Sequence, residues 1–170
     1  MIKNMPETYV STDIETDGPI PGPHSMLSIG SAAYDEAGNL IDTFSVNLFP
    51  LEGASPDPDT KAWWATQPEA WAVVNKDQKE PLTAMREYCE WVRQLPGRPV
   101  FVGYPAGFDF TFVYWYTVKF VKKCPFSFSA IDMKTMAMSI LGLRFKDTTK
   151  KSMPKRWFPA ELLGAIPTGR

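Results

Sequence analysis

The sequence predicts a single α/β domain built on a mixed five-stranded sheet, in which a three-stranded antiparallel meander joins two parallel strands and helices flank the sheet. Two observations predict it. Residues 8–49 have the spacing of strands, with alternating or short apolar runs between turn signals. From residue 59 onward, helical spacing alternates with short apolar strands, and this alternation favours parallel pairing through crossover connections.

The opening strands are expected over residues 8–15, 26–34 and 40–49. The first is rich in β-branched residues and stops at the Asp-Gly-Pro turn signal of residues 17–19. Residues 35–39 form a hairpin-like loop between the other two, so neighbouring strands should run antiparallel.

Helices and further strands are expected in the rest of the chain. Asp59 and Thr60 can cap a short helix that carries Trp63 and Trp64 and ends in a turn. The helix over residues 81–95 begins with Pro, and its apolar stripe consists of Leu82, Met85, Cys89, Val92 and Leu95. The other expected elements are a strand over 99–103, a buried helix over 109–121 that is apolar on nearly all sides, a strand over 127–132 and a helix through Met136 and Ile140.

Composition excludes several classes of protein. With 170 residues, 44% of them apolar and 14% aromatic, the chain can bury a sizeable core and does not resemble a disordered segment. It contains no apolar run of about 18 residues for a membrane span, and its N-terminus lacks the apolar stretch of a secretory signal. Cys89 and Cys124 cannot form a disulfide framework. These features indicate a cytoplasmic protein in a reducing setting, with no membrane partner.

Charge is unevenly distributed along the chain. Residues 1–80 contain four Lys or Arg and thirteen Asp or Glu, whereas residues 81–170 contain fourteen and six, which gives net charges of −9 and +8. The asymmetry suggests a polyanion partner on one side and a cation site on the other. Two solvated faces that segregate by chance are the alternative.

Asp13 and Glu15 form the first candidate site. On a strand they point to the same face with Cα atoms about 6.5–7 Å apart, and their repulsion is roughly 2 kcal/mol at an effective dielectric of about 20. A divalent cation offsets such repulsion, and hard oxygen ligands suit Mg²⁺ or Mn²⁺. The alternatives are polar residues at an exposed strand end, or an aspartyl-phosphate phosphotransferase, whose chemistry needs Asp where Glu15 stands.

Asp109 is the second candidate. The strand over residues 99–103 ends in a Gly/Pro turn that delivers Asp109 to the first turn of the next helix. The helix dipole and the free backbone N–H groups favour a carboxylate there, so Asp109 can be a helix cap. Because the ends of neighbouring parallel strands meet at one crevice, Asp109 can instead join Asp13 and Glu15.

Three convergent carboxylates in this order resemble the DEDD superfamily of 3′–5′ exonucleases, of the DEDDh type, which has a ribonuclease-H-like fold. The resemblance covers nearly the whole chain, in segments 13–18, 27–34, 107–109 and 130–137. It implies one exonuclease domain over residues 1–170 that hydrolyses phosphodiesters at the 3′ end of single-stranded RNA or DNA. It also implies a two-metal mechanism with Mg²⁺ or Mn²⁺. Relatives of this type are commonly dimers, so a homodimer stays open.

The resemblance further implies roles for individual residues. Asp13 would bridge both ions, Glu15 would bind the ion on the nucleophile side, and Asp109 would hold the other. Substrate contacts are expected from Thr16 and Asp17 beside the terminal nucleotide, from Phe108, Phe112 and Trp63 through stacking, and from Lys150, Lys151 and Arg156 through phosphates. Core packing is the alternative for the aromatic residues, and a solvated loop is the alternative for the basic tract over residues 144–158.

The sequence departs from the family pattern in two places. Tyr104-Pro105 stands where the family usually carries His-Asn. The third motif, a His with an Asp five residues later, is absent after Asp132, where the remaining acids are Asp147 and Glu161. The chain is therefore expected to lack its final helix, to bind metal weakly and to turn over slowly.

Two other hypotheses remain. One is a catalytically incomplete nucleic-acid-binding domain of the same fold, and the other is an unrelated α/β domain with incidental carboxylates. His24, in a Pro-rich loop, is expected to be a surface residue or to contact substrate near the first motif.

Overall fold

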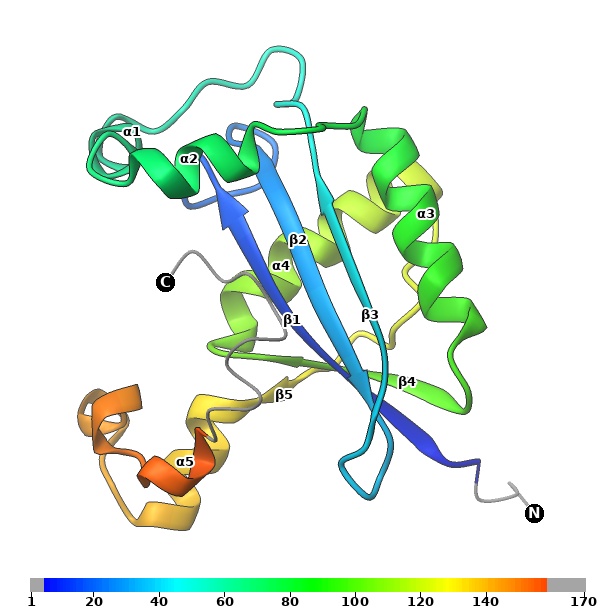
Figure 1. Ribbon diagram of the computed structural model, residues 1–170, viewed down its shortest axis with the longest axis vertical. Coiled ribbons are helices and arrows are strands. Elements are labelled where there is room, and N and C mark those ends of the chain that lie inside the picture. The colour runs from blue at the N-terminus through cyan, green and yellow to red at the C-terminus, as the bar shows by residue number, and fades with distance from the viewer. Residues whose placement is uncertain (1–4, 159–170) are drawn as a thin grey trace.

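The computed structural model describes residues 5–158 and contains the expected five-stranded sheet, in the order β3-β2-β1-β4-β5 (Figure 1). β1 and β2 pair antiparallel, as do β2 and β3, whereas β4 runs parallel to both β1 and β5. The strands are β1 (Glu7–Thr16), β2 (Met26–Tyr34), β3 (Leu40–Asn47), β4 (Arg98–Gly103) and β5 (Ile131–Asp132). The predicted meander and the two parallel strands are confirmed.

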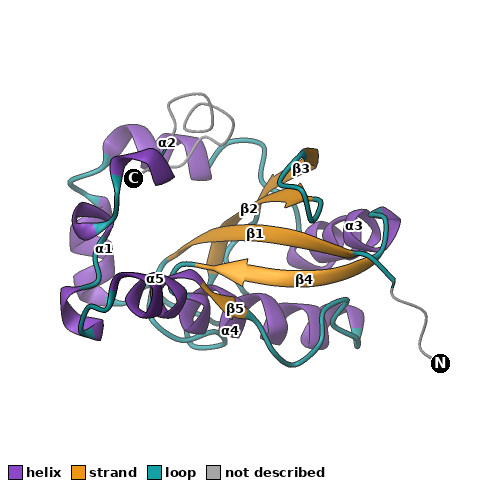
Figure 2. Cartoon of the chain, turned by 90° about the horizontal axis from the view of Figure 1, so that it is seen from below, coloured by secondary structure: helices purple, strands orange, loops and turns teal. Residues whose placement is uncertain are grey.

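Helices connect and cover these strands. Figure 1 shows α1 and α2 beside the carboxyl end of β1, and Figure 2 shows α4 running along β4 and β5. Their bounds are α1 (Pro58–Trp64), α2 (Pro68–Val74), α3 (Pro81–Gln94), α4 (Ala106–Tyr116) and α5 (Met133–Leu141). α4 continues into the π-helical turn η1 (Thr117–Val121), and the short 3-10 helices η2 (Phe145–Asp147), η3 (Lys150–Ser152) and η4 (Lys155–Trp157) follow α5. No helix of these described segments is long and apolar enough to cross a membrane.

The core lies between one face of the sheet and the helices α3 and α4. The two-residue period of β1 turns Val10 and Ile14 toward this face, where they belong to the same buried cluster as Phe112 of α4. The intervening residues of β1 point to the opposite face. Asp13 and Glu15 are among them. Because the neighbouring residues of β1 are fixed in the core, both carboxylates project from the opposite face of the sheet.

Leu82 is the exception in the stripe predicted for α3, because its side chain is 38% exposed. The first turn of α3 is buried through Pro81 and Ala84 instead. Tyr88, which is not part of the predicted stripe, is fully buried, and its hydroxyl lies 3.3 Å from the Ser31 hydroxyl. Burial raises the pKa of the Tyr88 phenol. A polar tip that finds a hydroxyl partner thus allows this tyrosine to occupy a core position.

Two further expectations were wrong for local reasons. Asp57, rather than Asp59 or Thr60, caps α1, because its carboxylate accepts a hydrogen bond from the Thr60 backbone N–H at 2.9 Å. The strand expected over residues 127–132 contains only its last two residues. Ser127 Oγ accepts a hydrogen bond from the backbone N–H of residue 129 at 3.1 Å, a local bond that competes with strand pairing.

The later helices are less buried than their composition predicts. α4 and η1 cover the expected helix, but Tyr114 and Val118 are exposed, so the prediction that this helix is buried on nearly all sides was wrong. α5 likewise exposes Met136 and Ile140. The turn expected after α1 is present at residues 65–66, and the short helix α2, which was not predicted, begins directly after it at Pro68. Each of these helices packs on the body of the protein through one side only.

Candidate active site

Asp13 and Glu15 share one wall of a cavity of about 660 Å³ at the carboxyl end of β1. In the sheet they lie opposite Gly30 and Ser28 of β2, and the side chain of Glu15 is only 8% exposed. The predicted common face of the two carboxylates is confirmed. The other walls come from β2, β3 and the α1–α2 region, and their polar residues are Ser28, Ser45, Asn47, Thr66, Gln67 and Glu69.

Trp64 closes the cavity next to the end of β1. Its indole Nε1–H donates a hydrogen bond to the Thr16 carbonyl at 2.9 Å, and its ring lies 4.9 Å from that of Trp63 and 5.2 Å from that of Trp71. Trp64 is buried and lines the cavity, whereas Trp63 is partly exposed. Adjacent residues of a helix point about 100° apart, so one tryptophan of the pair is buried and the other is partly exposed.

Asp17 holds the loop that follows β1. Its carboxylate accepts a hydrogen bond from the Ser25 backbone N–H, and its carbonyl accepts one from the Asp57 N–H at 2.8 Å. The side chain is buried. Through these hydrogen bonds Asp17 stabilises the loop that follows β1, and its carboxylate points toward the backbone of that loop.

His24 packs over Gly18 in the same loop. A Cβ atom at Gly18 would lie 2.3 Å from the His24 ring, so only glycine fits there. His24 Nδ1 lies 2.9 Å from the Ser55 carbonyl oxygen. His24 is half-buried, and its contacts make it part of the loop that closes this end of the sheet rather than a free surface residue.

Asp109 lies in the first turn of α4, as predicted, and its side chain is 3% exposed. It does not occupy the cap position, which belongs to Pro105, the second residue of a cis peptide. The N–H of Ala106 instead donates to Asp132 Oδ2 at 2.7 Å. Asp109 is therefore a buried carboxylate in the first turn of α4. The first backbone N–H of this helix, that of Ala106, is hydrogen-bonded by Asp132 and not by Asp109.

The described residues do not contain a complete metal cage. Among residues 5–158, no three His, Cys, Asp or Glu side chains are close enough together to hold a metal ion. The donor chemistry of Asp13 and Glu15 suits a hard divalent cation, but the described side chains bring no third such ligand to them. Glu161, a late acid considered from the sequence, lies outside the described residues.

The aromatic residues beside Asp109 belong mainly to the core. Phe112 is fully buried and lies in the central cluster, so the stacking contact expected of it was wrong. Phe108 is half-buried, and its ring lies 5.3 Å from that of Phe112. Phe108 lies near the start of α4 and Phe112 one turn farther along it, so Phe108 remains partly accessible and Phe112 is covered by the core.

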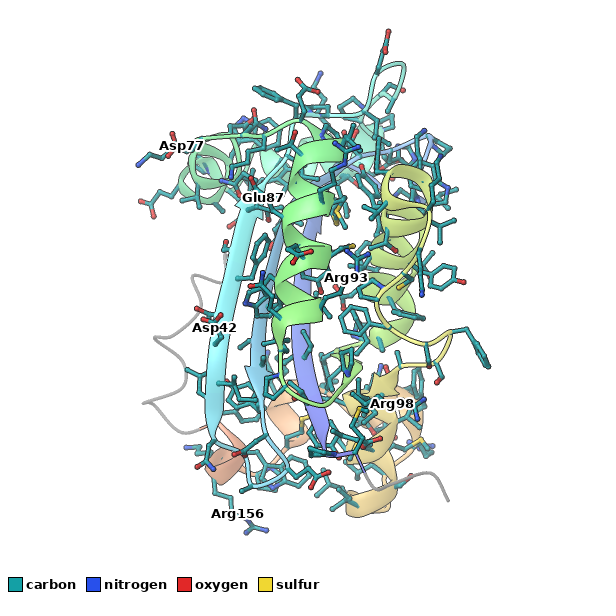
Figure 3. The ribbon with its side chains drawn as sticks, turned by 90° about the vertical axis from the view of Figure 1, so that its right-hand side faces the viewer. Asp42, Asp77, Glu87, Arg93, Arg98 and Arg156 are labelled. Carbon is teal, nitrogen blue, oxygen red and sulfur yellow. The ribbon has the colours of Figure 1, made fainter. Side chains whose placement is uncertain are left out.

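The basic tract approaches the carboxyl end of β4. Lys150 Nζ lies 5.6 Å from the centre of the Tyr104 ring, and burial raises the pKa of that tyrosine. Lys150, Lys151 and Arg156 are exposed, and Figure 3 shows Arg156 pointing away from the body of the protein. None of the three lines the cavity that contains Asp13. The structure thus brings the tract next to the turn that precedes Asp109 and keeps it outside the carboxylate cavity.

Sequence reasoning missed two features of the site. Asp132, which bonds Ala106, stands between an apolar strand and a helix, and an Asp at such a junction is a recognisable helix-cap signal. The polar wall formed by Ser28 and Asn47 becomes visible only when the register of β1, β2 and β3 is known, because register decides which residues share a face.

Comparisons with known proteins identify the family of this chain. Residues 8–156 match the family described as the 3′-5′ exoribonuclease Rv2179c-like domain. A curated relative, the 3′-5′ DNA exonuclease Cap18 of Escherichia coli, is 32% identical over 152 residues, which cover 88% of this chain and 78% of the relative.

Solved structures of exonuclease I share the fold. The E. coli enzyme in complex with a dT13 oligonucleotide matches with a TM-score of 0.65 at 16% identity, over 83% of this chain and 31% of that one. The ExoI/SSB-Ct complex matches with a TM-score of 0.64 over the same shares. The chain thus spans about a third of the length of these structures, and the likeness establishes a ribonuclease-H-like fold. The match over residues 8–156 shows that the chain belongs to the Rv2179c-like 3′-5′ exoribonuclease domain family.

Proposed function

We propose that this chain is a 3′–5′ exonuclease that removes nucleotides from the 3′ end of single-stranded nucleic acid. The observation that carries the proposal is the pair Asp13 and Glu15 in one wall of a cavity of about 660 Å³, in a member of a 3′–5′ exonuclease family. Cavities of roughly 300–1,000 Å³ are typical of small-molecule sites, and a terminal nucleotide is within that range.

Divalent ions would be held by Asp13 and Glu15 directly and by Asp109 partly through water, since the three do not form a metal-holding group among the described residues. Mg²⁺ usually keeps several waters and uses one or two carboxylates together with substrate phosphates, which agrees with the lack of a complete cage among the described residues. When two ions are bound, they supply an activated water and stabilise charge on the leaving 3′ oxygen. The side chains of the protein fix where this chemistry takes place, because Asp13 and Glu15 lie on a rigid central strand.

Other residues would hold the strand. Thr16, whose carbonyl accepts the hydrogen bond from Trp64 at the end of β1, would sit against the terminal nucleotide. Trp63 and Phe108 are the partly exposed rings near this end of the sheet, and rings of this kind stack on bases without sequence preference. Lys150, Lys151 and Arg156 would bind phosphates farther along the strand, because an exposed basic tract attracts the backbone of nucleic acid.

A second candidate is a domain that binds single strands without cleaving them. It is favoured by the position of Asp109, which does not line the cavity that contains Asp13 and Glu15. The two candidates differ in one observable. The exonuclease shortens a strand in the presence of Mg²⁺ or Mn²⁺, whereas the binding domain retains it intact.

One experiment tests both the cleavage and the preference for RNA or DNA. The family description names an exoribonuclease and the E. coli relative is a DNA exonuclease. Incubation of 5′-labelled single-stranded RNA and DNA with the protein and Mg²⁺ should give a ladder that shortens from the 3′ end for at least one of them. Intact strands of both kinds, with binding detected, would favour the second candidate.

A further inference from the structure

A second cavity lies on the outer side of α4 and η1 and contains none of the candidate catalytic carboxylates. It has a volume of about 670 Å³, and its walls include Phe110, Tyr114, Trp115, Lys119 and Phe128. The helical residues come from two neighbouring rows at four-residue spacing, so they share one side of the helix. Phe128 reaches the same cavity from the loop that precedes β5.

Two of the aromatic side chains of this cavity are exposed, and the other two are half-buried. On the inner side of α4, Phe112 and Tyr116 are fully buried in the core. On the outer side, Tyr114 is 40% exposed and Phe128 is 89% exposed. A helix that is apolar on both sides packs on the sheet through only one of them. Contiguous exposed apolar surface is typical of interaction sites in soluble proteins.

The charged residues of the segment that forms the cavity are all lysines. Between Phe110 and Ile131 the chain contains three lysines, at positions 119, 122 and 123, and no acidic residue. All three are exposed, and none of them takes part in the ion pairs found within residues 5–158. Lys119 Nζ lies 4.6 Å from the centre of the Trp115 ring. The cavity therefore combines flat rings with cations that are not neutralised by neighbouring carboxylates.

We propose that this cavity is a second contact for single-stranded nucleic acid, at which bases stack on the rings and phosphates meet the lysines. A positively charged groove with aromatic platforms is the general solution for binding single strands without sequence preference. An acidic peptide would satisfy the charge, but the set of several separate flat rings suits successive bases better than one apolar anchor. The site would hold a part of the strand away from the 3′ end, and in this respect the inference rests on the proposed exonuclease function.

The position of α4 connects the cavity with the candidate active site. Asp109 lies in the first turn of this helix, and the cavity begins at the next residue, Phe110. Lys119 lies ten residues after Asp109, which corresponds to about 15 Å along the helix axis at about 1.5 Å per residue. Asp13 and Glu15 lie on the face of the sheet opposite α4, so a strand whose 3′ end is bound there would pass around the start of α4 before it meets the rings and then the lysines of this helix.

The test is a binding measurement that does not depend on cleavage. Fluorescence anisotropy of a 5′-labelled oligo(dT) and oligo(rU) of about 20 nucleotides, in EDTA, gives the Kd of the wild type and of Tyr114→Ala, Phe128→Ala and Lys119→Glu. Each aromatic substitution should weaken binding by roughly 5- to 150-fold, the range measured for single stacking contacts. Lys119→Glu should also reduce the salt dependence of Kd by about one phosphate contact.

Controls and contrary outcomes separate this inference from the proposed function. Phe49→Ala and Arg86→Glu remove an exposed ring and reverse an exposed charge elsewhere, and they should leave Kd unchanged. Unchanged Kd for all three cavity variants overturns the inference, even if the protein trims strands. The same holds if an acidic aromatic peptide binds at the cavity and the oligonucleotides do not. If the wild type fails to trim but the cavity variants lose binding, the inference stands and the exonuclease proposal fails.

Discussion

The carboxylate of Asp132 accepts a hydrogen bond from the backbone N–H of Ala106 at 2.7 Å and so links the start of α4 to the start of α5. Its other oxygen accepts one from the Thr135 N–H at 2.6 Å and caps α5. Since Ala106 begins the helix whose first turn carries Asp109, one side chain outside the carboxylate cavity fixes the turn that presents a candidate catalytic residue.

We predict that Asp132→Ala lowers the free energy of unfolding by about 1–3 kcal/mol, because two helix N-termini lose their acceptor. Asp132→Asn is the matched control, since its amide oxygen still accepts a hydrogen bond and Asn is itself a good cap, and it should cost clearly less. Urea denaturation at neutral pH measures both. Equal stability of the wild type and Asp132→Ala would contradict the assigned role.

The same pair of proteins should show a defined pH dependence. Partial burial raises the pKa of Asp132, but hydrogen bonds from Thr135 and Ala106 outweigh it, and the net pKa lies below the ordinary value of 3.8. Such a carboxyl stabilises the fold above its unfolded-state pKa and loses that effect as pH falls through its folded-state pKa. The stability difference between the wild type and Asp132→Ala should therefore be constant from about pH 7 to 5 and shrink below about pH 4. A difference that grows toward acid pH refutes the argument.

Trp64→Phe should disturb the end of β1. The substitution removes the donor to the Thr16 carbonyl and leaves that oxygen without this partner, at a cost of about 1–3 kcal/mol. Since Glu15 is the neighbouring residue, exonuclease activity should fall together with stability. Trp71→Phe is the control, because Trp71 is exposed and contacts the ring of Trp64 without bonding the strand. Equal stability and activity of the two variants would disprove this role of Trp64.

Gly18→Ala should destabilise the loop after β1. The new Cβ would lie 2.3 Å from the His24 ring, so the ring or the backbone must move, and overpacking of this kind costs about 1–3 kcal/mol. Gly107→Ala is the matched control, because its Cβ would meet nothing within 4 Å and alanine is the better helix former. Thermal unfolding should give a lower Tm for the first variant and an unchanged or higher Tm for the second; a Tm for Gly18→Ala at or above that of the wild type would contradict the steric argument.

Divalent ions should bind more tightly when a 3′ end is present. Hard divalent ions such as Mg²⁺ use one or two carboxylates together with substrate phosphates, so a 3′ end bound beside Asp13 and Glu15 would add ligands to the ion. Binding of Mn²⁺, measured by electron paramagnetic resonance, should strengthen roughly tenfold or more with a hydrolysis-resistant oligonucleotide, which corresponds to about 1.4 kcal/mol. Equal affinity with and without the oligonucleotide would contradict this account, and Asp13→Asn should abolish the difference.

The strands could be predicted well because their signals are local. The period of two in β1 decides both the strand and its two faces, so the common side of Asp13 and Glu15 follows from sequence alone. α4 was harder to predict. A helix that is apolar on all sides is predicted to be buried. Whether every side is covered depends on the rest of the chain, and here the side that carries Tyr114 remains exposed.

The candidate site was predictable in its carboxylates and less so in its surroundings. An aromatic residue can either stack on substrate or fill the core, and residue type alone does not distinguish the two. Phe112 was expected to contact substrate, but its side chain is buried in the core. Asp17 illustrates the same limit, since its carboxylate bonds a backbone amide of residue 25 that only the loop conformation brings near. Contacts between distant segments of this kind are fixed by tertiary structure and leave no local pattern.

The most direct test compares trimming of a 5′-labelled single strand by the wild type, Asp13→Asn and Asp77→Asn in the presence of Mg²⁺ or Mn²⁺. Asp77 is the matched control, because it lies outside the cavity lining and has a positive φ of 50° that asparagine also adopts readily. The account predicts stepwise shortening from the 3′ end by the wild type and Asp77→Asn, and a loss of at least about a hundredfold for Asp13→Asn. Equal trimming by Asp13→Asn and the wild type would contradict it.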